Sequence, residues 1–214
     1  MSILVKEKIL ERLYKGDIVF EPGLDIYQLQ AHSVDLRLGF TFLVSKDWRL
    51  TDRGRVAIQL DYGESSNHFE TIELEKGQYF EVLPKEFVVV ATLEKIKLPK
   101  DIMAVLYPRS SINRRGLSVD LSGIVDAGYE GNLIIPIRNN TSNQVVRVYP
   151  GERFCQLVFQ DLGEVIKTRD SRWAKKDVVV GILKEKYPTE SRLVRLGLIS
   201  ELKKKHPLNI KKKY

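Results

Sequence analysis

Apolar and polar residues alternate with the period of β-strands along most of this chain. The alternation is clearest in HSVDLRLGFTFLV, where Val34, Leu36 and Leu38 share one face, and a β-branched run at residues 88–90 is typical of a buried strand. Similar segments are IVFEPG, NLIIPIRNN, QVVRVYP and GERFCQLVFQDL. We therefore predict an all-β body of many short strands, in the form of a sandwich, a jelly roll or a barrel.

Two segments have helical spacing instead. Residues 5–15 carry apolar side chains every three or four positions before Gly16, which predicts one short N-terminal helix. Residues 189–205 predict a C-terminal helix with a basic end, because four apolar side chains follow the same spacing: Leu193, Leu196, Ile199 and Leu202. The polar, turn-rich residues 46–75 are interpreted as a surface excursion that joins short strands, and we assign no function to them.

Length and composition indicate one principal domain. A chain of 214 residues with 43% hydrophobic content can bury an adequate core. We predict a β domain with its N-terminal helix over residues 1–165, and a C-terminal extension over 166–214. No apolar run approaches the roughly 20 residues of a membrane span, and the N-terminus has charges where a signal peptide is apolar. We therefore expect a cytoplasmic protein that does not enter a membrane.

The charge and the few metal-binding side chains limit the functional classes. Much of the formal charge of +7 comes from six lysines after residue 202. A solvated basic tail is the favoured interpretation, and an anionic partner such as nucleic acid is the less favoured one. One cysteine, Cys155, permits no internal disulfide, and three histidines make a zinc site difficult to build.

The polar chemistry concentrates between residues 107 and 131. Arg109, Ser110 and Ser111 follow a proline, so a guanidinium, two hydroxyls and backbone N–H groups crowd into one bend that suits phosphate oxygens. Asp126 lies between an apolar pair and a glycine turn, where packing alone explains a carboxylate poorly. Asp35, inside an alternating strand, either points to solvent or holds a site from within.

Five blocks carry a resemblance to a known family: HSVDLRLG, ATLEKIKLPKDI, YPRSSINRRGL, GIVDAGYEGNL and YPGERFCQLVF. Over residues 1–162 the chain resembles the superfamily of dCTP deaminases and dUTPases. The resemblance implies a dUTPase-like distorted jelly roll or β-sandwich with short terminal helices. It also implies a homotrimer that acts on deoxynucleoside triphosphates at sites between subunits.

The same resemblance implies roles for single residues. Asp126 matches the aspartate that deprotonates a water for attack on the α-phosphorus of dUTP, while Mg²⁺ bound by the triphosphate offsets the developing charge. Tyr129 matches the aromatic residue that packs on the deoxyribose. Asp35 matches an aspartate that reaches the metal indirectly, through phosphate or water. The residues that match the family's triphosphate ligands are Arg109, Ser110, Ser111 and Gln156.

The deaminase pattern is matched only in part. Ser110 and Arg114 correspond to its serine and arginine, but Pro136 stands where its water-activating glutamate is expected, with Glu130 the nearest other carboxylate. We therefore predict a dUTP diphosphatase that gives dUMP and pyrophosphate. The alternatives are a dCTP deaminase, a bifunctional dCTP deaminase and dUTPase, or a non-catalytic nucleotide- or nucleic-acid-binding relative.

The chain has no glycine-rich C-terminal arm of the kind that closes over the nucleotide in ordinary dUTPases. The segment 171–191 offers cations and two aromatic rings, so it is a candidate lid. A docking strand without ligand contact is an equally good interpretation.

Overall fold

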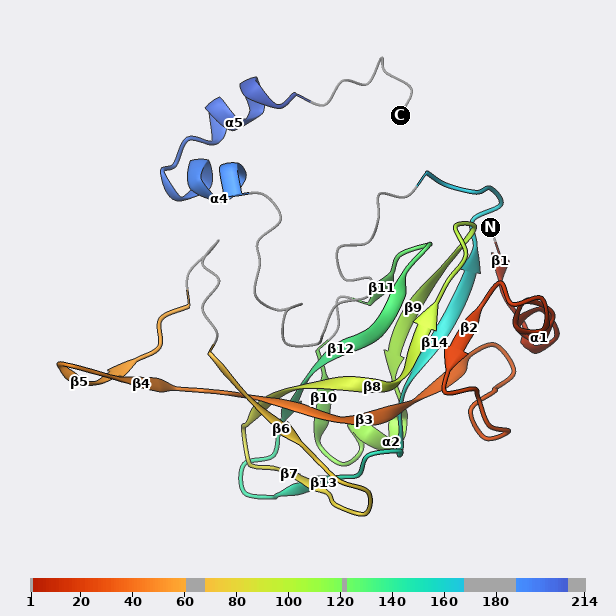
Figure 1. Cartoon of the computed structure of the whole chain (residues 1–214), viewed down its shortest axis with the longest axis horizontal. Coiled ribbons are helices and arrows are strands. Elements are labelled where there is room, and N and C mark those ends of the chain that lie inside the picture. Colours follow the sequence, from red (N-terminus) through yellow and green to blue (C-terminus); the bar gives the residue numbers. More distant parts are fainter. Residues whose placement is uncertain (1, 61–67, 121–122, 168–187, 208–214) are drawn as a thin grey trace. The chain divides into compact units, whose positions relative to one another are not determined.

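The computed structural model describes residues 2–60, 68–120, 123–167 and 188–207. The chain forms two compact units, one of residues 1–45 with 69–178 and the other of 46–68 with 179–214. Figure 1 labels the elements of both units. The candidate lid segment and the end of the basic tail fall mainly or wholly outside the described residues, and the predicted boundary at residue 165 stays a prediction.

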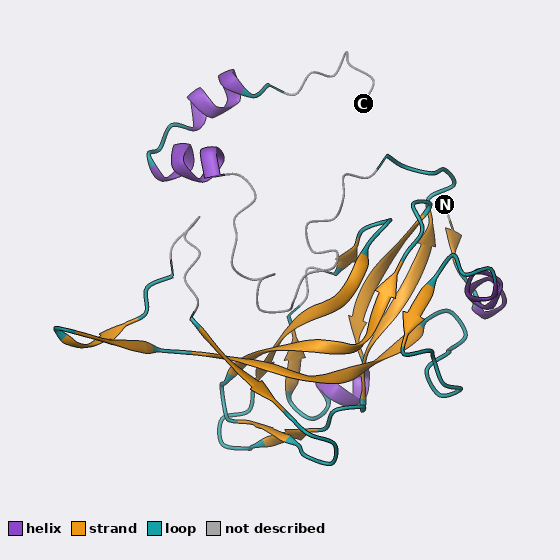
Figure 2. Cartoon of the chain, viewed as in Figure 1, coloured by secondary structure: helices purple, strands orange, loops and turns teal. Residues whose placement is uncertain are grey.

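The larger unit is built on an antiparallel sheet of ten strands (Figures 1 and 2). Its main path runs in the order β10-β12-β8-β3-β14-β9-β11. These strands span Leu117–Val119 (β10), Glu130–Asn139 (β12), Phe87–Lys97 (β8), Val34–Ser45 (β3), Arg153–Asp161 (β14), Ile102–Pro108 (β9) and Ile124–Val125 (β11). Off this path, β1 (Ser2–Ile3) pairs with β14, β2 (Val19–Glu21) with β8, and β6 (Phe69–Glu73) with β3. The prediction of an all-β body is confirmed.

Alternation along the long strands produces the core. Leu133, Ile135 and Ile137 on β12 are at most 8% exposed, while the residues between them are only half-buried. A two-stranded sheet of β7 (Phe80–Val82) and β13 (Val146–Val148) contributes to the same core. Phe80 stacks on Phe42 with 4.5 Å between the ring centroids, and this contact joins the small sheet to the large one.

The described residues of the larger unit form two helices. α1 (Lys6–Tyr14) confirms the predicted N-terminal helix and buries Ile9 completely. Arg12 in its last turn pairs with Asp17 at 3.0 Å and with Asp101 at 2.8 Å, which ties the helix to the start of β9. The bend after β9, interpreted from sequence as a polar turn, is the four-residue helix α2 (Ser110–Asn113).

The smaller unit contains the hairpin of β4 (Trp48–Thr51) and β5 (Gly54–Ala57) and two helices, α4 (Pro188–Arg195) and α5 (Ile199–Lys205). The predicted C-terminal segment is helical, but it forms two helices instead of one, because Gly197 has a φ of +71° and follows the end of α4. The Leu198 N–H bonds back to the Leu193 carbonyl at 2.8 Å, so the chain turns before it becomes helical again. No helix among the described residues is long and apolar enough to cross a membrane.

Candidate functional site

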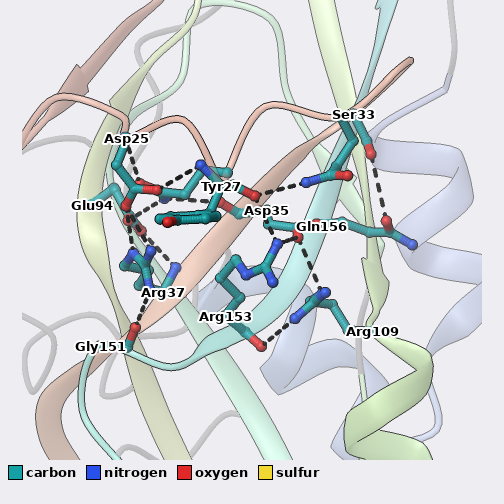
Figure 3. A network of polar contacts seen from close by, with 12 residues as sticks. Asp25, Tyr27, Ser33, Asp35, Arg37, Glu94, Arg109, Gly151, Arg153 and Gln156 are labelled. Atoms are coloured by element: carbon teal, nitrogen blue, oxygen red, sulfur yellow. Dashed lines mark hydrogen bonds and ion pairs between the residues drawn. The ribbon is translucent and has the colours of Figure 1, made fainter.

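A buried carboxylate between two guanidinium groups forms the centre of the candidate site (Figure 3). Asp35 on β3 has a side chain only 2% exposed, and its Oδ2 lies 3.2 Å from Arg109 Nε and 3.2 Å from Arg153 Nη1. The two arginines also contact each other, because Arg109 Nη1 donates to the Arg153 carbonyl at 3.3 Å. The alternative that Asp35 points inward is therefore the correct one.

Strand pairing brings these distant residues together. β14 lies between β3 and β9, and Gln156 on β14 is the register partner of Asp35 on one side and of Tyr107 on the other. Arg109 follows the end of β9, so its side chain reaches the same position on the sheet. Three segments that are far apart in sequence thus contribute one carboxylate, two guanidiniums and one amide.

The charges of Asp35, Arg109 and Arg153, called the trio below, favour an anionic ligand. Burial raises the pKa of Asp35, and the charges of Arg109 and Arg153 act in the opposite direction. The two guanidiniums carry two positive charges against at most one negative charge from Asp35, so the three side chains together have a net positive charge. Guanidinium N–H groups that the carboxylate does not occupy remain able to donate to phosphate oxygens.

A cleft of about 310 Å³ opens beside this trio. That volume is at the small end of the usual range for ligand sites. The Ser110 side chain is exposed, and the Ser33 hydroxyl donates to Gln156 Oε1 at 3.5 Å. The residues that line the cleft are Gln30, Asp35, Pro108, Arg109, Ser110, Asn113 and Gln156. Four of the residues predicted to bind phosphate or metal therefore lie together: Asp35, Arg109, Ser110 and Gln156.

A second layer of buried polar side chains supports Asp35, and sequence analysis missed it. Glu94 on β8 is 1% exposed, and its two oxygens accept from Gln28 Nε2 at 2.7 Å and from the Arg37 N–H at 3.0 Å. Gln28 Nε2 also donates to the Asp35 carbonyl at 2.9 Å. Burial raises the pKa of Glu94, while the hydrogen bonds to its carboxylate oppose that shift. The one available signal in the sequence was a carboxylate in a strand that begins with a long apolar run.

Arg37 anchors this layer to the loop before β3. Its Nη2 lies 2.6 Å from Asp25 Oδ2, and its Nη1 donates to the Gly151 carbonyl at 2.5 Å. Arg153 fixes the same loop, because its Nη1 donates to the Tyr27 carbonyl at 2.7 Å. The strand that carries Asp35 is thus held in place from both of its neighbours, as Figure 3 shows.

Asp126 and Tyr129 lie in a different environment. The glycine turn after Asp126 does not close a hairpin. β11 pairs with β9, whereas β12 pairs with β8 and β10, so the turn crosses between distant parts of the sheet. The Gly128 N–H donates to the Pro99 carbonyl at 3.0 Å, and Gly128 has a φ of +78°, which favours glycine. Asp126 is exposed, and its carboxylate has no hydrogen bond or ion pair with any described residue.

Tyr129 is fixed by both ends of its side chain. Its ring packs against the core, and its hydroxyl donates to the Asn132 carbonyl at 2.6 Å. Burial raises the pKa of this hydroxyl to about 12, so the ring is neutral. Neither Asp126 nor Tyr129 lines the cleft beside Asp35, and neither do Ser111 and Arg114. Within one chain, the cleft therefore contains residues predicted to bind phosphate or metal, and not the residues predicted to act on the sugar or the attacking water.

Pro136 lies in the middle of β12, opposite Val89 on β8. Its carbonyl accepts from the Asp120 N–H at 2.9 Å, and as a proline it offers neither an N–H nor an ionisable group. Glu130 is six positions earlier on the same strand, roughly 20 Å away at the usual rise per residue, and its side chain pairs with Lys95 at 3.2 Å. Glu130 is thus not a neighbour of the position that Pro136 occupies.

The fold and the cleft define the class first: an all-β protein with a cationic site suited to phosphate oxygens. The family follows from comparison with known proteins. Residues 3–162 match the model of the dCTP deaminase-like family, and the chain belongs to that family. It is therefore a nucleotide-processing enzyme.

Curated relatives are named dCTP deaminase, dUMP-forming. The protein from Methanobrevibacter smithii is 36% identical over 163 residues, which are 76% of this chain and 81% of that protein. The protein from a Sulfurihydrogenibium strain is 39% identical over 157 residues, 73% of this chain and 82% of its own length. The protein from Aquifex aeolicus is 35% identical over 160 residues, 75% of this chain and 82% of its own length.

A solved structure agrees on the fold. The 2′-deoxycytidine 5′-triphosphate deaminase from Agrobacterium tumefaciens superposes with a TM-score of 0.57 at 24% identity. The superposition covers 74% of this chain and 48% of that one.

These relatives correct the functional prediction. The sequence was interpreted as a plain dUTP diphosphatase because Pro136 replaces the deaminase glutamate. The curated relatives are instead deaminases that form dUMP, so the plain diphosphatase assignment is wrong, and the bifunctional alternative agrees better with them.

Proposed function

We propose that this protein converts dCTP to dUMP, with release of ammonia and pyrophosphate and consumption of two water molecules. The observation that carries the proposal is the match to dUMP-forming deaminases, at 36% identity over 76% of the chain. The charge at the cleft agrees with it, because a triphosphate is strongly anionic and the trio at Asp35 carries excess positive charge.

The cleft at Asp35 is proposed to bind the triphosphate. Arg109 and Arg153 would donate to phosphate oxygens, while Asp35 keeps both guanidiniums oriented before the ligand arrives. Ser110 and Gln156 add a hydroxyl and an amide to the same cleft, and Ser111 is adjacent in α2. Preorganised donors of this kind lower the cost of binding, because little rearrangement is needed.

Magnesium fits this site as part of the substrate rather than as a resident ion. Among the described residues, no group of three or more His, Cys, Asp or Glu side chains could hold a metal. The Oδ2 atom of Asp35 already contacts two cations, which compete with a metal ion. The ion would therefore arrive bound to the triphosphate, and Asp35 would reach it only through phosphate or water.

Asp126 is proposed to activate the water that attacks the α-phosphorus. Its carboxylate is exposed and has no partner among the described residues, so it can accept a proton from an incoming water. Tyr129, with its ring held against the core, would supply the surface on which the deoxyribose packs. Ser110 and Arg114 lie on or next to α2 and are proposed to assist the deamination of the base.

A homotrimer would unite the two halves of the site. Residues of the Asp35 cleft and residues of the Asp126 turn do not line one cleft within a single chain. If they meet between subunits, co-expression of Arg109→Ala with Asp126→Asn regenerates some complete sites. Random assembly of equal amounts predicts about a quarter of the wild-type activity. No recovery in mixed oligomers, or full activity in a stable monomer, would contradict a shared site.

The direct test is incubation of the purified protein with dCTP, and separately with dUTP, in the presence of magnesium. We expect dUMP, pyrophosphate and ammonia from dCTP, and dUMP and pyrophosphate from dUTP. Chromatography separates the nucleotides, and coupled assays measure ammonia and pyrophosphate. Hydrolysis of dUTP with no ammonia from dCTP would refute the proposal, and so would inactivity towards both nucleotides.

A further inference from the structure

The proposed deamination needs a proton-transferring group that the position of Pro136 cannot provide. Attack of water on C4 of cytosine requires a general base to take a proton from the water. Loss of ammonia requires a general acid to return protons to the nitrogens of the cytosine ring and its amino group. A carboxylate performs both tasks, and Pro136 has none. Some other acidic side chain must reach the same location if the chain deaminates dCTP.

The strand next to Pro136 ends at such a side chain. β10 pairs with β12 in the register Leu117↔Asn139, Ser118↔Arg138 and Val119↔Ile137. The ladder continues one step further, because the Asp120 N–H donates to the Pro136 carbonyl at 2.9 Å. Asp120 is therefore the cross-strand partner of Pro136, one residue beyond the end of β10.

Directly opposed residues in an antiparallel pair project from the same face, with Cβ atoms about 4.5–5.5 Å apart. On β12 the core face consists of Leu133, Ile135 and Ile137, so Pro136 belongs to the other face. Asp120 shares that other face with Pro136. The Asp120 carboxylate therefore starts about one strand spacing away from where a glutamate at position 136 would start. It also projects from the same face of the sheet.

Two further observations mark Asp120 as available for chemistry. Its side chain is exposed and has no hydrogen bond or ion pair with any described residue. Pro136 also lacks the N–H that would otherwise bond to the Asp120 carbonyl, so Asp120 is held to β12 by one ladder hydrogen bond instead of two. Glu130, by contrast, pairs with Lys95 and lies six positions along β12.

We propose that Asp120 is the proton-transferring catalytic residue for deamination, in place of the glutamate that Pro136 replaces. This inference rests on the proposed function. Asp120 takes a proton from water as the water oxygen bonds to C4, and the electron pair of the C4–N3 double bond moves to N3, which receives that proton. Asp120 then carries the hydroxyl proton to the exocyclic nitrogen, the C4–N bond breaks, and ammonia leaves with uracil as the product.

The test compares Asp120→Asn with wild type in two assays, ammonia release from dCTP and pyrophosphate release from dUTP. Loss of general acid–base catalysis predicts that ammonia release falls on the order of 100-fold or more. Pyrophosphate release from dUTP should stay within about twofold, since that step is assigned to Asp126, and this also verifies folding and binding. Asp52→Asn, an exposed aspartate in the β4–β5 turn, is the matched control and should leave both rates unchanged.

A double variant tests whether a carboxylate on the opposite strand can replace that of Asp120. Adding Pro136→Glu to Asp120→Asn restores a carboxylate on the same face from the opposite strand, so part of the ammonia release should return. Wild-type deamination that persists undiminished in Asp120→Asn would overturn this inference and leave the proposed function intact. Absence of ammonia release from the wild-type protein would instead overturn both.

Discussion

Replacement of Gly39 by alanine should separate the two longest strands of the sheet. Gly39 lies on β3 where the register with β8 shifts between Leu38 and Phe42. A Cβ at this position would lie 2.8 Å from the Ala91 carbonyl oxygen and 3.1 Å from that of Thr92. Both obstacles are backbone atoms, so no side chain can rotate away and β3 itself must move.

Overpacking of this kind costs about 1–3 kcal/mol, and a backbone obstacle favours the upper end of that range. In a protein of this size, each 1 kcal/mol lowers Tm by about 2–4 °C, so we expect Gly39→Ala to lower Tm by about 6–12 °C. The displaced strand also carries Asp35 and Arg37, so binding of a non-hydrolysable deoxynucleoside triphosphate should weaken.

Scanning calorimetry and a binding titration measure these two effects. The control is Gly23→Ala, because a Cβ at Gly23 meets nothing within 4 Å and its backbone is not left-handed. The control should have the wild-type Tm within about 1 °C. If Gly39→Ala has the same Tm as the control, the close approach of β3 and β8 does not limit the size of the residue at position 39, and the reasoning is refuted.

Three other predictions concern the site and the C-terminal segment. Glu94→Gln should cost about 1–3 kcal/mol in urea unfolding at pH 7, because one of the two donors from Gln28 and Arg37 loses its acceptor. Because the pKa of Glu94 is raised, the native state binds its proton more tightly than the unfolded state does. The stabilising contribution of this group is therefore present at acid pH and is lost as pH rises through that pKa. Between pH 4 and pH 7, the wild-type protein should lose more stability than the Glu94→Gln variant. Asp126→Asn should slow pyrophosphate release about 100-fold to 10,000-fold while ammonia release from dCTP persists, and an equal loss of both products would show that Asp126 serves the whole site. Truncation after Leu202 should leave turnover unchanged, and a large fall in kcat with intact folding would show that the lysine-rich end reaches the substrate.

The sequence was sufficient to predict the long strands from two simple patterns. On β12, apolar and half-buried residues alternate regularly, whereas β3 and β8 contain runs of buried residues that are rich in β-branched side chains. The helix break at Gly197 was not predicted, because the apolar spacing continues through it, and only the left-handed backbone of the glycine separates α4 from α5. Local periodicity therefore predicted element types better than element boundaries.

The site was predictable in its residue types but not in its arrangement. Arg109 and Asp35 were recognised from their local segments, whereas their ion pair depends on β14 lying between β3 and β9. Strand order is a global property that no local pattern encodes. Glu94 escaped detection for the same reason, because a carboxylate in a strand is ordinary until its neighbours are known to be buried. Likewise, the importance of Asp120 emerges only from its register with Pro136.

The central place of β14 in the sheet also has a consequence for how the chain acquires its activity during synthesis. β14 ends at residue 161, yet it fills the gap between β3 and β9, which are complete by residues 45 and 108. Until β14 emerges, both neighbours present unpaired edges, the kind of surface that pairs with other chains. The guanidinium of Arg153 arrives with the same strand, 118 residues after the carboxylate that it contacts. A nascent chain of this protein therefore completes the cleft beside Asp35 and pairs the facing edges of β3 and β9 in one late event, which depends on slow, long-range pairing.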